Sequence, residues 1–301
     1  RYISSGSSRL HIAVWEPSGE RKAIMQISHG MIEYIKRYSH FANYLNQAGI
    51  LVIGNDHKGH GLTAEKDEDL GYFGEEKSAA VIEDLHEVTR YAKEQYGADV
   101  PYFLFGHSMG SLAVRAFAAE HDDCIDMLIV CGSPSENKAR PLGKAIACVE
   151  GRILGAHHKS KLLEAMSLGA YAMKFRGEGN RNSWICSDPE VYKAYTESDL
   201  CGFTFTDDAY LALFDLMKKA YDVHGWRCTR SKMPVLFISG AEDPCLGNVR
   251  KFAGAVHAMR RAGYLDVKGK LYQGMRHEIL NEKDHEKVWK DIAVYIKKKG
   301  F

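Results

Sequence analysis

The sequence predicts an α/β fold in which a mostly parallel β-sheet is covered by helices on both faces. Short runs rich in β-branched and aromatic residues recur along the chain, and Gly, Pro, Asp or Asn bound each of them. Amphipathic helical stretches alternate with these runs. The 301 residues are enough for one large α/β domain with an insertion, or for two ordinary domains.

Six short apolar segments are predicted to be the parallel strands of this sheet. They are Ala23–Ile27, Leu51–Gly54, Tyr102–Phe105, Met127–Cys131, Val235–Ser239 and Val267–Tyr272. The segment Leu10–Trp15 has alternating side chains, which indicates an earlier, antiparallel strand at an edge of the sheet.

Two helices carry strong signals. In Ser78–Tyr96 an apolar stripe with helical spacing predicts a helix packed on the sheet; it consists of Val81, Ile82, Leu85 and Val88. The last helix is predicted to begin at Asn281 as its N-cap and to end at Lys297–Lys299 and Gly300. It is expected to bury Val288, Ile292, Tyr295 and Ile296.

The alternation of strands and helices stops between residues 135 and 230. Helical stretches such as Leu162–Phe175 and Tyr210–Tyr221 gather Met, Leu and Ala there, and the strand pattern resumes at Val235. We therefore predict a core of residues 1–134 and 231–301 with a helical cap inserted at 135–230. A separate helical domain is the alternative.

Composition excludes several classes of protein. A formal net charge of +1 argues against a nucleic-acid partner, because such binding needs a large basic excess. Stable membrane insertion is not expected, since no apolar run approaches the ~20 residues that span a bilayer. The seven cysteines are widely spaced and contain no C-x-x-C pair. This pattern predicts reduced thiols and a cytoplasmic location.

The pentapeptide Gly106–Gly110 has the pattern G-x-S-x-G and lies between a predicted strand and a predicted helix at Leu112–Ala119. This placement is typical of a nucleophile elbow, a strained turn that lifts a serine hydroxyl above a sheet. Ser108 is the candidate nucleophile. The alternative is a purely structural turn, because the pattern alone also arises by chance.

A serine nucleophile needs a base, and the base needs an orienting acid, in the chain order Ser, Asp or Glu, His. Asp243 leaves the end of the predicted strand at 235–239 and is the candidate acid, with Glu242 in the same loop as its rival. His277 follows the strand at 267–272 and is the candidate base, because an imidazole can accept the serine proton.

An oxyanion hole needs two N–H donors. The backbone N–H of Met109, directly after the nucleophile, is one candidate. The N–H of Met31 is the other, because Gly30 lets this loop approach the substrate closely.

The segment Asn55–Gly61 contains two histidines, His57 and His60, that could bind a metal. No further ligand cluster lies nearby in the sequence, and a structural loop tied together by Asp56 and backbone amides is the favoured interpretation. No metal and no organic cofactor is therefore expected.

Together these motifs resemble the monoacylglycerol lipase and lysophospholipase branch of the α/β-hydrolases, grouped with serine aminopeptidases. The matching pieces span nearly the whole predicted core: His29–Glu33 with Arg37-Tyr38, Asp56–Gly61, Gly106–Gly110, Gly240–Asp243 and Arg276–Glu278. Residues 188–206 resemble the cap of bacterial lysophospholipases.

The resemblance implies an eight-stranded α/β-hydrolase sheet, the triad Ser108, Asp243 and His277, and an oxyanion hole at Met31 and Met109. It implies a small-molecule ester with a single acyl chain as the substrate. Ile32 and Tyr34 depart from the family pattern at the mouth of the site, so they weaken the inference about substrate size.

Other functions stay open at this point. Cofactor-free lyase or carbon–carbon hydrolase chemistry would use the same triad. An aminopeptidase would need cap carboxylates to hold a free α-amino group, for instance Glu190 or Glu197. A non-catalytic ligand-binding protein of the same fold would be expected to lack part of the triad, whereas all three residues are present.

Overall fold

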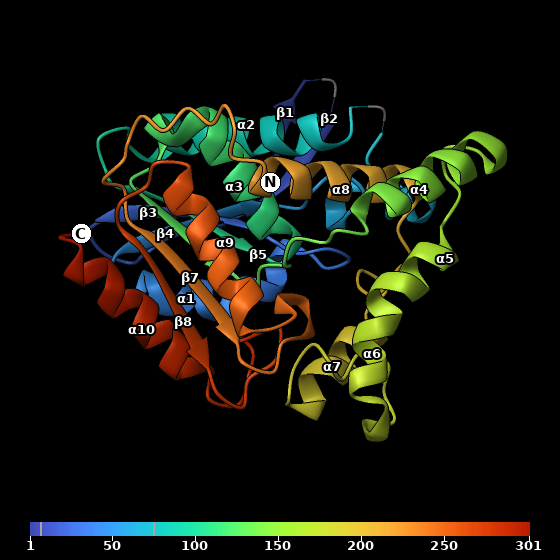
Figure 1. Cartoon of the computed structure of the whole chain (residues 1–301). Coiled ribbons are helices and arrows are strands. Elements are labelled where there is room, and N and C mark those ends of the chain that lie inside the picture. Colours follow the sequence, from blue (N-terminus) through green and yellow to red (C-terminus); the bar gives the residue numbers. More distant parts are fainter. Residues whose placement is uncertain (7, 75) are drawn as a thin grey trace.

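The computed structural model describes residues 1–6, 8–74 and 76–301, and an eight-stranded sheet forms its centre. The strands lie in the order β1-β2-β4-β3-β5-β6-β7-β8 (Figure 1). Their bounds are β1 Tyr2–Ser5, β2 Ser8–Trp15, β3 Ala23–Ser28, β4 Ile50–Asn55, β5 Tyr102–His107, β6 Met127–Cys131, β7 Val235–Gly240 and β8 Val267–Tyr272. The six strands from β3 to β8 run parallel, as predicted, and each agrees with its predicted bounds to within two residues.

The antiparallel strand β2 is also confirmed, but its predicted position at the edge is wrong. β1 pairs outside it, with Tyr2 opposite His11 and Ser5 opposite Ser8, while β2 pairs antiparallel with β4 on its other side. Residues 2–5 read YISS, a short and largely exposed run without a clear apolar pattern. Such an edge strand is held by backbone pairing, which leaves little trace in the sequence.

Ten α-helices are present in the part of the chain that the structure describes. They are α1 Ser39–Asn46, α2 Ser78–Tyr96, α3 Met109–His121, α4 Arg140–Leu154, α5 Lys161–Glu164, α6 Ala170–Lys174, α7 Pro189–Glu197, α8 Asp207–Tyr221, α9 Val249–Arg261 and α10 His285–Lys298. The predicted bounds of α2 are confirmed.

The last helix has its N-cap at Asp284, three residues later than the predicted N-cap Asn281. The amide of Asn281 donates to Glu278 instead of capping a helix. The Glu282 carboxylate accepts from the backbone N–H groups of Ser187 and Arg276. These tertiary bonds hold the segment as a series of turns. The apolar stripe is as predicted except that Tyr295 is only half-buried.

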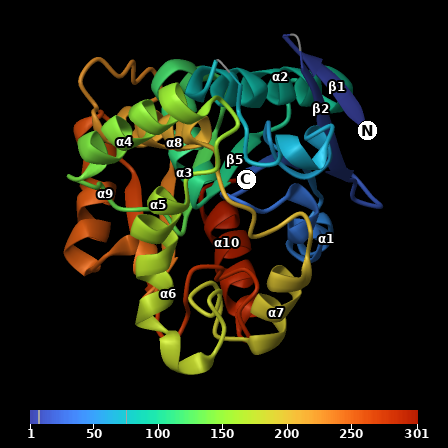
Figure 2. The same cartoon turned by 90° about the vertical axis from the view of Figure 1, so that its right-hand side faces the viewer.

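The sheet separates two apolar cores. On β5, Tyr102 and Leu104 join the core beneath α2, α3, α8 and α9, whereas Phe103 and Phe105 join the core beneath α1 and α10. This alternation follows from the two-residue period of a strand that is buried on both faces. Helices on both faces therefore cover a mostly parallel sheet, which confirms the predicted fold class (Figures 1 and 2).

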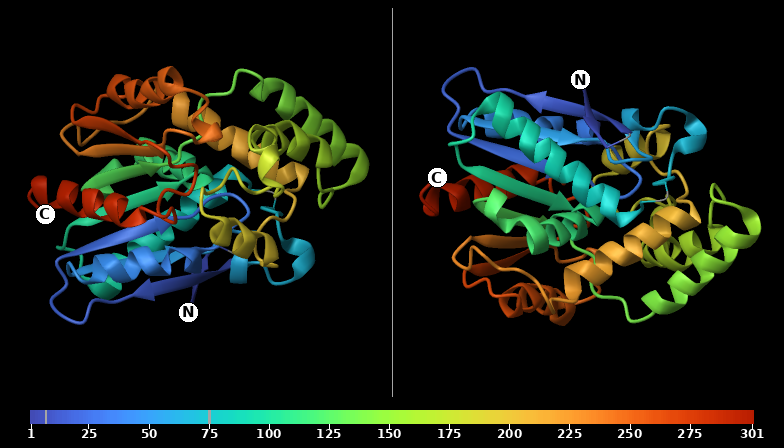
Figure 3. Two further views of the ribbon diagram at one scale, coloured as in Figure 1. Left: turned by 90° about the horizontal axis from the view of Figure 1, so that it is seen from below. Right: turned by 90° about the horizontal axis from the view of Figure 1, so that it is seen from above.

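The chain between β6 and β7 contributes helices α4 to α8 and no strand to this sheet in the described residues. A π-helical turn at Ala165–Gly169 joins α5 to α6, so the predicted helical stretch 162–175 is nearly continuous. Figure 3 shows α4 to α7 beyond the edge toward which the parallel strands point. α8 instead packs against α3 of the core.

No helix in the described part of the chain has both the length and the apolar character needed to cross a membrane.

Candidate active site

Ser108 lies at a sharp turn between β5 and α3. Its backbone adopts φ 53° and ψ −119°, a conformation that costs a non-glycine residue of order 1–3 kcal/mol. The glycines around it are required by packing. A Cβ at Gly106 would lie 2.4 Å from the carbonyl oxygen of Gly110, and one at Gly110 would lie 2.1 Å from that of Ser28. The turn thus has the strained, tightly packed form expected of a nucleophile elbow.

Asp243 and His277 meet at the carboxyl ends of the neighbouring strands β7 and β8. Asp243 Oδ2 lies 2.9 Å from His277 Nδ1, and both side chains are buried. Asp243 also accepts from Cys245 N–H at 2.8 Å and from the Ser239 hydroxyl at 3.1 Å. These donors fix the carboxylate against the imidazole. The rival acid Glu242 is exposed and lies outside this contact.

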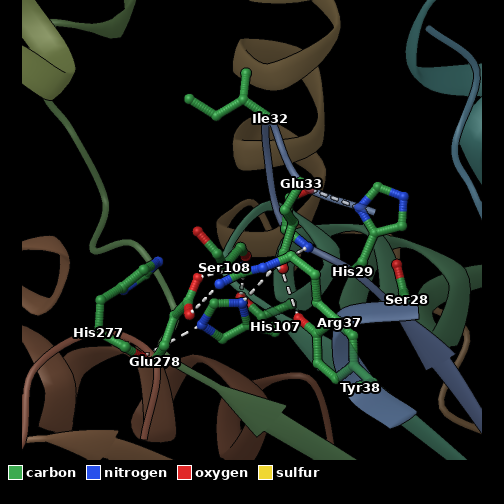
Figure 4. Close-up of polar contacts among 12 residues, drawn as sticks. Ser28, His29, Ile32, Glu33, Arg37, Tyr38, His107, Ser108, His277 and Glu278 are labelled. Carbon is green, nitrogen blue, oxygen red and sulfur yellow. Dashed lines mark hydrogen bonds and ion pairs between the residues drawn. The ribbon is translucent and has the colours of Figure 1, made fainter. Parts of the chain in front are cut away.

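Ser108 and His277 line the same pocket, and Figure 4 shows the imidazole turned toward the serine. Among the described residues no hydrogen bond joins the Ser108 hydroxyl to His277. The Nε2 atom of His277 lies 4.0 Å from Cys245 Sγ. The ring of Trp184 covers the imidazole, with centroids 5.0 Å apart. The free nitrogen of His277 therefore faces a largely enclosed space that the serine also borders.

The two predicted N–H donors border this pocket as well. Met109 is the first residue of α3, so its N–H has no acceptor within the helix. In the structure as described, the N–H of Met31 donates to no other group of the protein, although its neighbours on both sides do. The arrangement can present two N–H groups to one oxygen atom.

Behind the elbow lies a buried group of charged and polar side chains that the sequence analysis did not assign. Glu33 accepts from Gly30 N–H at 2.6 Å, from the Tyr38 hydroxyl at 2.9 Å and from Arg37 at 2.8 Å. Its other neighbour is His107 Nδ1, at 3.1 Å. Burial acts to raise the pKa of Glu33, but His107 and Arg37 outweigh it, so the pKa is lowered and the carboxylate is ionised.

Arg37 connects this group to the loop of the candidate base His277 (Figure 4). Its guanidinium makes two hydrogen bonds to Glu278, at 2.5 and 2.7 Å, and lies over the Tyr195 ring at 4.9 Å. Glu278 directly follows His277 in the chain. Arg37 and Glu278 are 241 positions apart, so spacing gave no sign that they pair. The only signal was their presence in two motifs of the family resemblance.

The loop after β4 is tied together by Asp56, as predicted. Its carboxylate accepts from the backbone N–H groups of Ile35 at 2.8 Å and Leu62 at 2.9 Å, and it contacts His11 Nδ1 at 2.8 Å. His57 and His60 contact neighbouring protein groups through Nε2. The loop is therefore a structural one in which the histidines take part in hydrogen bonding.

Within the described residues, two groups bring three potential metal ligands within 4.8 Å of one another. The first is Asp243, Cys245 and His277, where acid and base already bond to each other and burial raises the pKa of the Cys245 thiol well above its usual range. A protonated thiol is a poor ligand. The second is Glu150, His158 and Asp207, none of which lines the pocket around Ser108. The expectation that no metal is used stays a prediction.

Apart from the polar groups described above and Asn137 and Ser167, the pocket around Ser108 is apolar. Its wall includes Leu168, Tyr171, Trp184, Leu213, Phe214 and Met217, all from the segment between β6 and β7. A strained serine turn, an aspartate–histidine pair on adjacent strands and free N–H groups above a mostly parallel sheet together define an α/β-hydrolase.

Comparison with known proteins agrees with this class. The family model described as serine aminopeptidase, S33, matches residues 19–284, and the chain belongs to this family. It is 25% identical over 296 residues to a monoacylglycerol lipase of Mycolicibacterium smegmatis, covering 98% of this chain and 95% of the relative. It is 32% identical to the monoglyceride lipase of Rattus norvegicus over 118 residues, 39% of this chain and 37% of that protein.

Solved structures give the same result. The crystal structure of a thermostable carboxyl esterase from Bacillus coagulans matches with a TM-score of 0.89 and 26% identity, covering 99% of this chain and 97% of that one. A soluble variant of the Saccharomyces cerevisiae monoglyceride lipase has the same fold, with a TM-score of 0.75 at 18% identity and coverage of 99% and 94%. These relationships support ester hydrolysis and confirm the predicted fold and family.

Proposed function

We propose that this protein hydrolyses carboxylic esters of single-chain lipids, such as monoacylglycerols or lysophospholipids, with Ser108 as nucleophile. The observation that carries the proposal is the buried 2.9 Å contact between Asp243 and His277 in the pocket that Ser108 borders. A carboxylate that holds Nδ1–H leaves Nε2 free to act as a base.

In this mechanism His277 takes the Ser108 proton as the serine oxygen bonds to the ester carbonyl carbon. The carbonyl oxygen becomes an oxyanion that accepts from the N–H groups of Met31 and Met109. His277 then gives its proton to the departing alcohol, which leaves an acyl-enzyme. Water attacks this ester with His277 again as base, releasing the fatty acid and restoring the hydroxyl. The hydrogen bond between the Ser108 hydroxyl and Nε2 is expected to form when substrate binds, since catalytic hydrogen bonds are often long before that step.

The proposed substrate class rests on two facts. The pocket wall from the segment between β6 and β7 is mostly apolar, with Asn137 and Ser167 as its polar members, which suits an acyl chain. Relatives that match over nearly their full length include a monoacylglycerol lipase and a carboxyl esterase. The same wall supports our assignment of residues 135–230 as an inserted cap on a core of 1–134 and 231–301. The seven free cysteines agree with a cytoplasmic location.

The aminopeptidase alternative has less support, although the family model carries that description. Glu190 and Glu197 are exposed and neither borders the pocket around Ser108. The carboxylates that do border it, Glu33 and Glu278, are both held by Arg37.

The test has two parts. A fluorophosphonate is expected to label the wild-type protein once and to leave Ser108→Ala unlabelled. Failure to label would favour a ligand-binding role without catalysis. Hydrolysis is then compared across p-nitrophenyl esters of graded chain length, natural monoacylglycerols and lysophospholipids, and amino-acid p-nitroanilides. Faster cleavage of the anilides would contradict the esterase assignment.

A further inference from the structure

The backbone of residues 30–32 is held on both sides of Met31. The N–H of Gly30 donates to Glu33 at 2.6 Å, and the carbonyl oxygen of Gly30 lies 2.7 Å from Nδ1 of His29. The N–H of Ile32 lies 3.2 Å from Nε2 of His60. The Met31 N–H between them is left without a protein acceptor in the described structure.

Ile32 adopts a backbone conformation that a β-branched residue avoids. Its φ is +53°, and it is one of only three non-glycine residues with positive φ in the described chain. Its carbonyl oxygen accepts from the Tyr195 hydroxyl at 2.9 Å and from Gly202 N–H at 3.1 Å. Such strain persists only where surrounding contacts over-determine it. Here the contacts are His60 on the N–H side and Tyr195 and Gly202 on the carbonyl side.

His60 can accept a hydrogen bond from the Ile32 N–H because its ring is neutral and one tautomer is fixed by its surroundings. Its Nδ1 lies 3.0 Å from the carbonyl oxygen of Lys58, so Nδ1 carries the proton and Nε2 is left as an acceptor. Burial, followed by the charge of His57, lowers the pKa of His60 to about 3. At neutral pH the ring therefore cannot donate from Nε2 and can only accept from Ile32.

The surroundings of His60 hold the ring in place. Phe73, Phe203 and Phe205 surround it with centroids 5.3 to 5.5 Å away, and the ring is fully buried. Phe203 and Phe205 come from the segment between β6 and β7, which also supplies Tyr195 and Gly202. The loop of Met31 is thus fixed jointly by the core and by that segment.

We propose that His60 is a positioning residue for the oxyanion hole: as a neutral acceptor for the Ile32 N–H, it holds the Met31–Ile32 peptide in the strained conformation that directs the Met31 N–H into the pocket. This inference rests on the proposed function, because it assigns the Met31 N–H to the developing oxyanion. It makes His60 important for the reaction without contact to the substrate.

The test compares two substitutions at His60 with one outside the site. His60→Phe keeps an aromatic ring among the phenylalanines but removes the acceptor, and His60→Gln replaces the acceptor with an amide oxygen. His86→Phe changes a histidine that stacks on His121 elsewhere on the molecule. Loss of a whole oxyanion donor typically costs about 10²–10³ in rate, so partial misplacement is expected to cost His60→Phe about 10- to 100-fold in kcat.

In the expected result KM for a short p-nitrophenyl ester changes less than about threefold, because the interaction acts in the transition state. Affinity for a trifluoromethyl ketone, which forms a tetrahedral adduct with the serine, falls in parallel with kcat. His60→Gln recovers part of the rate, and His86→Phe behaves as wild type. Unchanged kcat in a folded His60→Phe protein would overturn the inference. If that variant does not fold, the rate and inhibitor affinity of His60→Gln decide.

Two measurements on the wild-type protein separate this inference from the proposed function. Nitrogen-15 shifts of the His60 ring report which nitrogen carries the proton, and hydrogen exchange reports protection of the Ile32 amide. If the Ile32 amide is protected and Nδ1 of His60 is protonated in a protein that hydrolyses no ester, the proposed function is rejected but the hydrogen bond between His60 and Ile32 is supported. If Nε2 of His60 is protonated and the Ile32 amide exchanges rapidly, the positioning role of His60 is rejected, whatever the activity.

Discussion

The carboxylate of Glu33 lies 3.1 Å from Nδ1 of His107, the residue that directly precedes Ser108. Both groups are buried. Glu33 also binds the Gly30 N–H and Arg37. One side chain therefore connects the loop at residues 30–32, the turn at Ser108 and, through Arg37, the segment that carries His277. The site is therefore held together from behind by ionised groups that do not touch the reacting atoms.

This relationship predicts that Glu33→Gln destabilises the protein. The amide keeps the shape but leaves His107 and Arg37 with a neutral neighbour, and loss of one partner from a buried ionic group costs about 2–4 kcal/mol. The free energy of unfolding is measured by urea denaturation. Glu190→Gln is the control, because Glu190 forms an exposed pair with Lys193 and its loss is expected to have no measurable effect. Equal midpoints for the two variants would contradict the prediction.

The positions of the parallel strands along the chain and the turn at Ser108 could be predicted from the sequence because their signals are local. Buried parallel strands are short apolar runs, and the turn at Ser108 needs glycines at fixed positions around it. The positions of Asp243 and His277 follow from the rule that loops leaving parallel strands meet at one edge of a sheet. The 2.9 Å contact agrees with that expectation.

The network around Glu33 could not be predicted in the same way. The Arg37–Glu278 pair joins residues 241 positions apart, and nothing in composition or periodicity says which buried charges meet. The start of α10 was missed for a related reason. Asn281 has the chemistry of an N-cap, but the carboxylate of the next residue, Glu282, accepts from the backbone N–H groups of Ser187 and Arg276, so contacts outside the helix override the local preference. The role of Ile32 is hidden because its strained φ depends on one acceptor and two donors supplied by distant segments.

The buried histidines beside the oxyanion loop predict loss of stability in mild acid. Burial, with His60 as the next cause, lowers the pKa of His29 to about 4, and burial with His57 lowers that of His60 to about 3. Below pH 6.5 the unfolded chain binds protons that the folded protein excludes. Each histidine therefore lowers the free energy of unfolding by up to about 1.4 kcal/mol per pH unit, between pH 6.5 and its own folded pKa.

Two neighbours modify this slope. His57, whose pKa is also lowered by burial, adds to it. His107 acts in a different range, because Glu33 outweighs burial and raises its pKa: its contribution is full below pH 6.5, is lost as pH rises through the folded pKa, and so offsets the decline only above pH 6.5. The net effect is a decline in denaturation midpoint from pH 7 to pH 5, with a shallower decline in His60→Phe. A midpoint independent of pH over this range would show that these histidines titrate normally in the folded protein.

Asp84 gives a prediction of opposite sign. Its Oδ1 accepts from the Ser5 hydroxyl at 2.6 Å, whereas its Oδ2 is buried without a hydrogen-bond partner. Burial raises the pKa of Asp84 to about 6, so the ionised carboxylate opposes folding at higher pH. Asp84→Asn is expected to stabilise the protein by about 1–2 kcal/mol at pH 8, and the gain should shrink toward pH 4, where the wild-type carboxyl is protonated in the folded protein and about half protonated in the unfolded chain.

Urea denaturation at pH 8 and pH 4 measures this difference. Asp99→Asn serves as the matched control, since Asp99 is exposed and its replacement is expected to leave the midpoint unchanged. A loss of stability in Asp84→Asn at pH 8 would mean that the charge on Asp84 is favourable in the folded protein, contrary to the burial argument.

Substitutions at the adjacent residues Asp243 and Glu242 decide which carboxylate orients His277. Asp243→Asn keeps the side-chain volume, but an amide can donate to Nδ1 and so favours the wrong tautomer of His277. By the behaviour of other serine triads, kcat should fall about 10³- to 10⁴-fold while the protein stays folded. Glu242→Gln removes a charge from the same loop, yet its side chain is exposed, and it should retain wild-type kcat. Single-turnover acylation by a p-nitrophenyl ester measures the step directly. If Glu242→Gln were the slower variant, the acid would be Glu242, and the buried contact between Asp243 and His277 would have to be structural.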